Sequence, residues 1–170
     1  KLKAIINVES NFMNNVDYAY CSKKGIHVIA TSPVFSKPVA EIALGMTLSL
    51  LRNIHNAHFD FVKGKEKYGL ESNLKASLLS GKKIGLLGFG DLAKFNPVSL
   101  NQMFKTCEII YVLAAVTTKN KNLVNKNLIN KMKTNSLFIL MSRAAVVNFK
   151  DLINRVKKGD IYVATDVFPE

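Results

Sequence analysis

The chain has 170 residues, of which 48% are apolar, so it is long and hydrophobic enough for a globular domain and is not a disordered protein. We expect its apolar runs to be too short to span a bilayer, and its N-terminus lacks the features of a signal peptide, which predicts a cytoplasmic protein without a membrane segment. The net charge of +12 comes mainly from scattered lysines and predicts a solvated surface, while a basic nucleic-acid-binding protein is an alternative that a steep salt dependence of binding would identify.

The first thirty residues are predicted to form two strands and a short helix. Apolar runs predict strands at 3–8 and 26–30. Between them, residues 17–24 are predicted to be helical, and Gly25 follows where a C-terminal cap is expected. This segment therefore begins an alternation of strands and helices.

A long helix is predicted next, after a turn at 31–33. Pro38 is expected in the first turn of this helix, where proline is tolerated because its missing N–H would have no helical partner. Apolar residues at helical spacing extend the helix over 39–62 and predict that one side of it is buried. The polar, glycine-punctuated residues 63–80 are expected to form a surface segment.

Beyond residue 82, short apolar runs alternate with helical segments. Strands are predicted at 83–87, 109–116, 136–141 and 161–165. Helices are predicted at 99–105, 125–132 and 149–157. Continuous apolar strands that alternate with helices are typical of a parallel sheet covered on both faces, which makes the fold class α/β.

The two cysteines, Cys21 and Cys107, lie far apart in the sequence and form no CxxC pair. They favour buried thiols in a reducing compartment over a disulfide or a metal site. We therefore expect no bound metal.

A glycine turn follows the strand at 83–87. Gly88-x-Gly90-x-x-Ala93 has the spacing of a dinucleotide-binding turn, in which one glycine permits the tight bend and the next lets backbone N–H groups approach a pyrophosphate. An ordinary tight turn is the alternative explanation of the same residues.

The helix that should follow this turn has too little sequence. Only 91–95 can be helical before Pro97, which is about one turn, whereas a β-α-β unit takes roughly 30 residues or more. The acid nearest the expected spacing for a ribose contact is Glu108, and it precedes the next strand instead of ending one. We infer that a helix, a strand and a connection are absent between Ala93 and Phe95, either because they are deleted from the protein or because the sequence omits residues that the protein has.

Several phrases occur in one order along the chain: KLKAIINVES, GIHVIATSP, PVAEIALGMTLSLLRNI, GKKIGLLGFGDLA, NPVSLNQMFKTCEIIYVLAAVT, NKNLINKMKTNSLFILMSRAAVV and GDIYVATDVFPE. This succession resembles the D-isomer-specific 2-hydroxyacid dehydrogenases, a family that includes phosphoglycerate, glyoxylate/hydroxypyruvate and D-lactate dehydrogenases. The resemblance implies that residues 1–32 end a flavodoxin-like substrate domain and that 33–170 form a Rossmann-like NAD-binding domain whose first β-α-β unit is incomplete. It also implies a homodimer through the 39–62 region.

The resemblance further implies a set of site residues. Arg143 in MSRAAVV matches the arginine that holds the substrate carboxylate, although a surface arginine at a strand end is the alternative. Ser10 and Asn11 match the substrate loop, which is usually glycine-rich. The residues implied to bind NAD, with NADP left open, are Gly88, Phe89, Gly90, Asp91, Leu92, Ala115, Thr117, Ser142 and Asp166.

The chain also departs from the family pattern. The acid–base histidine is expected in a segment beyond these residues, and His27, His55 and His58 do not match it. We therefore expect part of an oxidoreductase that transfers hydride between NAD(P)(H) and a 2-hydroxy or 2-keto acid, with the 170 residues inactive by themselves. The alternative is an inactive remnant that serves as a nucleotide-binding or dimerisation module.

Overall fold

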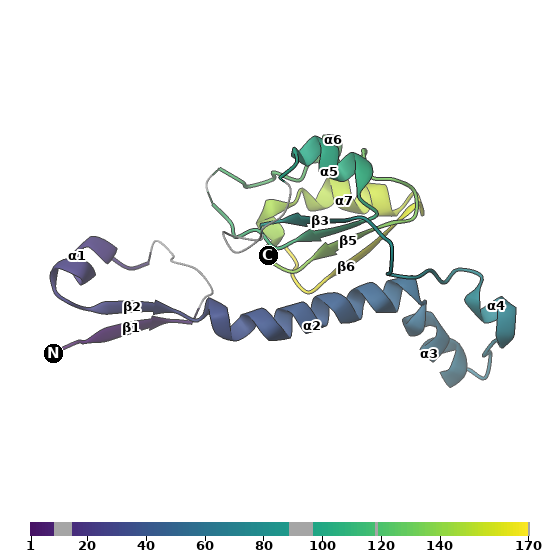
Figure 1. Cartoon of the computed structure of the whole chain (residues 1–170), viewed down its shortest axis with the longest axis horizontal. Helices are drawn as coiled ribbons and strands as arrows, with labels where there is room; N and C mark the ends of the chain where they lie inside the picture. The colour runs from purple at the N-terminus through teal and green to yellow at the C-terminus, as the bar shows by residue number, and fades with distance from the viewer. Residues whose placement is uncertain (9–14, 89–96, 118, 170) are drawn as a thin grey trace. The chain divides into compact units, whose positions relative to one another are not determined.

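Figure 1 shows the computed structural model of the chain, which describes residues 1–8, 15–88, 97–117 and 119–169. The chain forms two compact units, Lys1–Ile42 and Ala43–Glu170. The division falls within helix α2 (Ser32–Leu51), ten residues beyond the boundary expected from the sequence. The assignment of residues 1–32 to a substrate domain stays a prediction.

The first unit contains a parallel pair of strands, β1 (Ala4–Asn7) and β2 (His27–Ala30), with α1 (Tyr18–Lys23) between them in the sequence. The Asp17 carboxylate caps α1 by accepting a hydrogen bond from the Tyr20 N–H at 2.9 Å. Gly25 has a φ of +65°, as a residue just past a helix end often does. The predicted strands and helix of this segment are confirmed, with slightly narrower bounds.

Helix α2 begins earlier than predicted. The expected turn at 31–33 is wrong, because the helix already starts at Ser32, and Pro38 lies in its interior rather than in its first turn. Pro33 occupies the early position that tolerates proline. Pro38 removes one backbone donor from the helix, a local cost that the remainder of a 20-residue helix outweighs.

The single helix predicted over 39–62 is also wrong, because it is divided at Asn53. Asn53 has a left-handed backbone (φ 56°, ψ 31°), and α3 (Ile54–Val62) begins after it. The Leu51 carbonyl, at the end of α2, accepts a hydrogen bond from the Ser77 N–H at 2.8 Å. No residue of α3 is buried, and the segment that follows contains a short helix, α4 (Gly69–Asn73), which the sequence did not predict.

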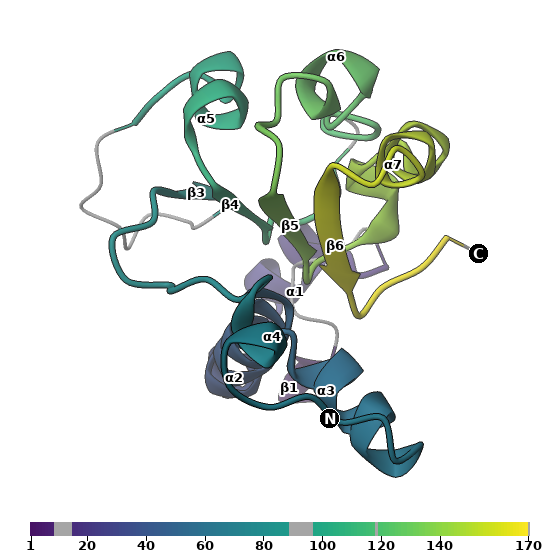
Figure 2. The ribbon, with the colours of Figure 1, turned by 90° about the vertical axis from the view of Figure 1, so that its right-hand side faces the viewer.

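The second unit is built on a four-stranded parallel sheet in the order β3-β4-β5-β6, which confirms the predicted fold class. Its strands are β3 (Ile84–Leu87), β4 (Ile109–Val112), β5 (Ser136–Leu140) and β6 (Ile161–Thr165). The helices that connect them are α5 (Leu100–Thr106), α6 (Lys126–Ile129) and α7 (Phe149–Val156). Figure 2 shows these three helices on one side of the sheet, and the part of α2 that belongs to this unit, residues 43–51, lies on the other.

Both faces of the two central strands, β4 and β5, are buried, and side chains along each strand alternate between these faces. Ile110 and Val112 of β4 belong to the main hydrophobic cluster, together with residues of α5, α6 and α7. Tyr111 points the other way, and its hydroxyl lies 2.6 Å from Oγ1 of Thr47, a fully buried residue of α2. The sheet is therefore the middle layer of the unit, as predicted.

Helix α2 also corrects the expectation that no segment is long enough to cross a bilayer. Pro33–Leu51 is 19 residues long with a mean hydropathy of 1.4, which meets that requirement by length and composition alone. Ala43, Thr47 and Leu51 are buried along one side of its C-terminal half, the pattern of a helix that packs on a protein core.

Candidate functional site

The four strands of the second unit bring their carboxyl ends to one edge of the sheet. Backbone hydrogen bonds continue past the strands: Leu113 N–H to Leu87 O at 2.8 Å, Met141 N–H to Val112 O at 3.1 Å, and Asp166 N–H to Leu140 O at 3.4 Å. In open parallel sheets, ligands bind outside this edge. The predicted residues Gly88, Ala115, Thr117, Ser142, Arg143 and Asp166 all follow the ends of these strands.

Gly88 ends β3 in a conformation that requires glycine. Its φ is +90°, and a Cβ at this position would overlap the backbone of Ala114 and come within 2.6 Å of the Ala114 Cβ. Gly88 itself therefore packs directly against Ala114, just past the end of β4. A tight bend at this position is what the first glycine of a nucleotide-binding turn makes possible.

Several predicted site residues lie outside the described part of the chain. They are Phe89, Gly90, Asp91 and Leu92 of the glycine turn, and Ser10 and Asn11 of the expected substrate loop. The inferred gap between Ala93 and Phe95 lies outside it too. These positions stay predictions.

The segment after β4 is held in a closed turn by Asn120. Its Oδ1 accepts a hydrogen bond from the Thr117 N–H at 2.6 Å, and its Nδ2 donates to the Ala115 carbonyl. Asn120 thus fixes the backbone of both predicted cofactor contacts. Sequence analysis missed this residue, although an asparagine a few positions past a strand end is a recognised turn signal.

Ser142 and Arg143 follow β5 and differ in their surroundings. The Ser142 Oγ is buried and has no hydrogen-bond partner among the described residues. Arg143 is exposed, with an extended backbone (φ −136°, ψ 133°), and its carbonyl accepts from the Val146 N–H to begin the 3-10 turn η2 (Ala144–Val146). Its guanidinium makes no ion pair within the described residues, so it is available to an external carboxylate.

Asp166 follows β6 and presents an exposed carboxylate. The turn that carries it is closed by the neighbouring Thr165, whose Oγ1 donates to the Val167 carbonyl at 2.8 Å and accepts from the Val167 N–H at 3.1 Å. Thr165 is thus a second residue that orders this edge and that the sequence did not single out.

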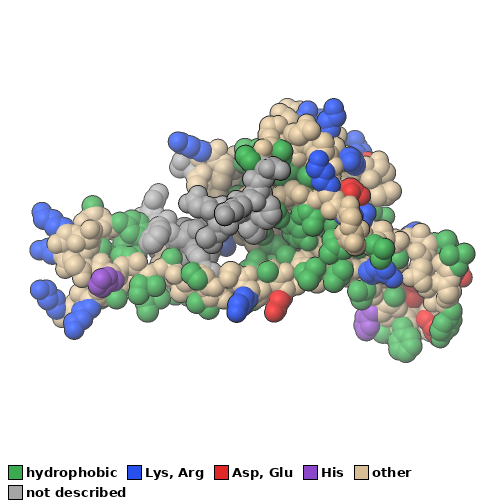
Figure 3. Space-filling view, in the orientation of Figure 1, with side chains coloured by type: hydrophobic (Ala, Val, Ile, Leu, Met, Phe, Trp, Pro, Cys, Tyr) green, Lys and Arg blue, Asp and Glu red, His purple; other side chains and the backbone are tan. Residues whose placement is uncertain are grey.

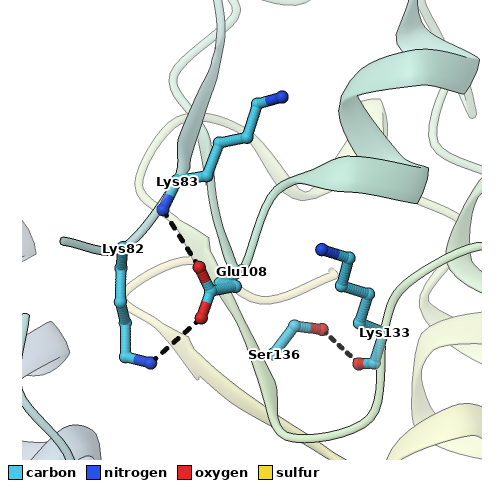
Figure 4. Close-up of polar contacts among 5 residues, drawn as sticks. All are labelled: Lys82, Lys83, Glu108, Lys133 and Ser136. Carbon is cyan, nitrogen blue, oxygen red and sulfur yellow. Dashed lines mark hydrogen bonds and ion pairs between the residues drawn. The ribbon is translucent and has the colours of Figure 1, made fainter.

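Glu108 lies at the opposite, amino edge of the sheet (Figure 4). It accepts hydrogen bonds from the Lys83 N–H at 3.1 Å and from Lys82 Nζ at 3.2 Å. These two bonds lower the pKa of its carboxyl group, the backbone bond from Lys83 most strongly. The prediction that Glu108 is in the wrong place for a ribose contact is therefore confirmed.

A separate cavity of about 490 Å³ lies between α3 and α4, away from the strand ends. Its lining includes Asp60, Lys67 and Glu71, and Lys67 Nζ is 2.6 Å from the Glu71 carboxylate. The hydrogen bond and charge of Glu71 raise the pKa of Lys67. No cluster of three or more His, Cys, Asp or Glu residues suited to a metal is found within the described residues.

Comparison with known proteins also relates the C-terminal part of the chain to a nucleotide-binding domain. Residues 91–170 match the model of the D-isomer specific 2-hydroxyacid dehydrogenase, NAD binding domain. This segment includes β4, β5 and β6 and therefore three of the four strand ends described above.

Individual relatives extend the similarity over nearly the whole chain. A hydroxypyruvate reductase from Thermotoga maritima is 27% identical over 92% of this chain and 59% of its own length. A glyoxylate/hydroxypyruvate reductase A from Arabidopsis thaliana is 25% identical over 98% of this chain and 61% of its own. The crystal structure of a phosphoglycerate oxidoreductase from Rhizobium etli superposes with a TM-score of 0.83 and 37% identity over 99% of this chain and 60% of that one. The chain thus spans about three fifths of the length of these relatives.

Proposed function

We propose, from the premise that the chain belongs to the D-isomer specific 2-hydroxyacid dehydrogenase family, that its protein transfers hydride between NAD(P)(H) and a 2-hydroxy or 2-keto acid. The observation that carries the proposal is the gathering of Gly88, Ser142, Arg143 and Asp166 at the carboxyl ends of three strands, β3, β5 and β6, of one parallel sheet. The activity belongs to the whole protein, because these residues span only part of the relatives' length.

Two features support a nicotinamide cofactor at this edge. The buried Ser142 Oγ has no partner among the described residues, and such a group is costly unless a ligand or water satisfies it. Gly88, with a φ of +90° and no space for a Cβ beside Ala114, makes the tight bend that the first glycine of a nucleotide-binding turn provides. When bound, the nicotinamide ring supplies the hydride chemistry, and the chain orients it. The exposed Asp166 carboxylate is suited to accept a hydrogen bond from its carboxamide.

Arg143 is assigned to the substrate. A planar guanidinium binds a carboxylate through two parallel N–H bonds, and its positive charge also polarises an adjacent carbonyl. Its backbone is fixed by η2, while its side chain is exposed. We assign proton transfer to a histidine outside these residues, since His55 and His58 lie on α3 and His27 lies on β2.

The alternative function is a nucleotide-binding or dimerisation module without turnover. It is favoured by the apolar side chains that α3 and α4 expose, among them Phe59, Phe61 and Leu70. Figure 3 shows hydrophobic side chains gathered over these helices. A homodimer through this region is compatible with either function.

A cytoplasmic location is part of the proposal. Cys21 and Cys107 are both free and buried, so neither forms a disulfide. Free buried thiols fit a reducing compartment.

Substrate binding to the NADH-saturated protein tests the role of Arg143. We expect Arg143→Gln to weaken glyoxylate binding about 10- to 100-fold, as loss of a charge-assisted bidentate contact does. The matched control is Arg52→Gln, an exposed arginine between α2 and α3, which should bind glyoxylate like the unaltered protein. Calorimetry measures both affinities, and equal affinities for the two variants would contradict the assignment.

Measurements of NADH binding and NADH oxidation distinguish an enzyme from a binding or dimerisation module. The 170 residues should bind NADH yet consume none with glyoxylate or hydroxypyruvate. Steady oxidation of NADH by these residues would refute the expected inactivity. A lack of NADH binding would instead favour a dimerisation module.

A further inference from the structure

The second unit's sheet lacks a feature that dinucleotide-binding folds share. In that fold, two mononucleotide-binding halves give the strand order 3-2-1-4-5-6, and the ligand lies where the order reverses. Here the four strands follow one another in chain order, from β3 to β6. The connecting helices α5, α6 and α7 all contribute to one hydrophobic cluster on one face of the sheet. Within the described residues, this sheet therefore has no point of reversal.

β3 pairs directly with β4 although a segment between them is inferred to be absent, and the strand order of the complete fold explains why. β3 carries the glycine turn and so occupies the place of strand 1, while β4, β5 and β6 occupy the places of strands 4, 5 and 6. Strands 1 and 4 are neighbours in the complete order, so a strand that lies on the far side of strand 1 can be absent without separating them. The described sheet thus contains three strands that correspond to the second half of the fold and one that corresponds to the first half.

The chain between β3 and α5 is too short to restore the missing strands. Residues 89–96 are all that lie between the described end of β3 and residue 97, and a β-α-β unit takes roughly 30 residues. The alignments with relatives are also longer than the part of this chain that they cover: 183 positions over 92% of the chain for the Thermotoga maritima protein and 194 positions over 98% for the Arabidopsis thaliana protein.

Among the described residues, β3 is an edge strand of the sheet. The carbonyls of Lys83 and Leu87 accept hydrogen bonds from β4 and the residue after it. Successive peptide groups of a strand point to opposite sides, so the backbone groups of Ile84 and Leu86 point away from β4. Among the described residues no strand pairs on that side, and Ile84 is 44% exposed. This is the side on which the adenosine half of a dinucleotide would need support.

We propose that the protein recognises its cofactor through the nicotinamide mononucleotide half alone, so that nicotinamide mononucleotide and NAD bind about equally well. Ser142 and Asp166 would contact the nicotinamide, Thr117 would border its ribose, and Gly88 would lie beside the single phosphate. The adenosine of NAD would project past the open edge of β3. The inference rests on the proposed function, because it concerns the same site.

Calorimetry with three probes tests the proposal: NAD, nicotinamide mononucleotide and ADP-ribose. We expect the dissociation constants of the first two to agree within about threefold, and ADP-ribose to bind at least about tenfold more weakly. NAD binding more than about tenfold tighter than nicotinamide mononucleotide, or ADP-ribose competing as well as NAD, would overturn the half-site and leave the cofactor assignment intact. No binding of any probe would overturn the cofactor assignment together with the half-site.

A variant provides a second readout. Ser142→Ala should weaken the binding of nicotinamide mononucleotide and of NAD by the same factor, about three- to tenfold, because both ligands would contact the same Ser142 hydroxyl. Glu108→Gln, at the opposite edge of the sheet, is the control and should change neither affinity. Amide NMR spectra show whether each variant keeps the fold. A loss confined to one of the two ligands would contradict the proposal.

Discussion

At the scale of the residue, Glu108 connects the amino ends of β3 and β4 through hydrogen bonds. It follows α5 and precedes β4, yet its carboxylate accepts hydrogen bonds from the main chain of Lys83 and the side chain of Lys82, just before β3. Its lowered pKa means that the folded protein favours the charged carboxylate. Because the carboxylate is partly exposed, solvent screens the interaction and the effect on stability is modest.

The lowered pKa predicts a pH-dependent effect of Glu108→Gln. A carboxyl whose pKa is lower in the folded state stabilises the fold above its unfolded pKa, and this contribution is lost as pH falls through the folded pKa. Glu108→Gln should therefore lower the urea midpoint at pH 7 and have little effect at strongly acidic pH. Glu41→Gln, an exposed glutamate of α2, is the control. An effect of Glu108→Gln that does not depend on pH would contradict the ion-pair explanation.

Single residues at the site were predictable to different degrees. Gly88 was recognised because its spacing encodes a backbone requirement, and the structure confirms that a side chain there would overlap Ala114. Asn120 was missed because its role is to close a turn whose partners, Ala115 and Thr117, become evident only from the backbone path. The buried, unpartnered hydroxyl of Ser142 is a property of the surrounding packing, and no sequence pattern encodes it.

At the scale of the element, one hydrogen bond connects α2 to the sheet. The Thr47 hydroxyl donates to the Ala43 carbonyl at 2.8 Å, so the buried Tyr111 hydroxyl donates to Thr47 Oγ1. Each hydroxyl has only one hydrogen, which fixes this direction. Helix and strand are thereby joined inside the core by a polar contact.

A double-mutant cycle measures this contact. Thr47→Val keeps the shape but leaves the Tyr111 hydroxyl buried without its acceptor, and should cost about 1–3 kcal/mol of unfolding free energy. Tyr111→Phe should cost about 0.5–1.5 kcal/mol, because the Thr47 hydrogen keeps its acceptor. The double variant should be less unstable than the sum of the two, as urea denaturation will show. Strictly additive losses would mean that the bond contributes nothing.

Elements of the second unit were easier to predict than the long helix. The strands are short apolar runs flanked by polar turns, and this pattern is enough to predict where they lie in the sequence. The division at Asn53 was missed because apolar periodicity continues through it, whereas the Leu51 carbonyl at the end of α2 accepts a hydrogen bond from Ser77, a tertiary contact that periodicity does not encode. The short α4 has no buried residue and hence no apolar pattern to reveal it.

At the scale of the whole molecule, the gap predicted from Pro97 has a consequence that the sequence did not reveal. Sequence reasoning inferred that a strand and helix were absent, but not that β3 would pair directly with β4. Pairing depends on which strands are spatial neighbours, and neighbours in an α/β sheet are not always consecutive in sequence. The core of the sheet does not depend on a strand beyond β3, because it lies around β4 and β5.

The exposed apolar side chains of α3 and α4 predict that the protein is a homodimer. Phe59 is 57% exposed and Val62 is 68% exposed, and residues three apart share one side of a helix. Apolar side chains clustered on a surface usually mark a contact with another molecule. We expect size-exclusion chromatography with light scattering to give a dimer, and Phe59→Ser combined with Val62→Ser to give a monomer.

The control for this prediction is Phe168→Ser, which removes a phenylalanine that is 70% exposed but lies after β6. A general loss of surface hydrophobicity would affect both variants alike, whereas an interface on α3 and α4 responds only to the first. A monomeric unaltered protein, or a monomer produced by Phe168→Ser as well, would contradict an interface there. A dimer that dissociates only in the α3 variant would also explain why α3 has no buried residue in the single chain, because its apolar side would be covered by the second copy.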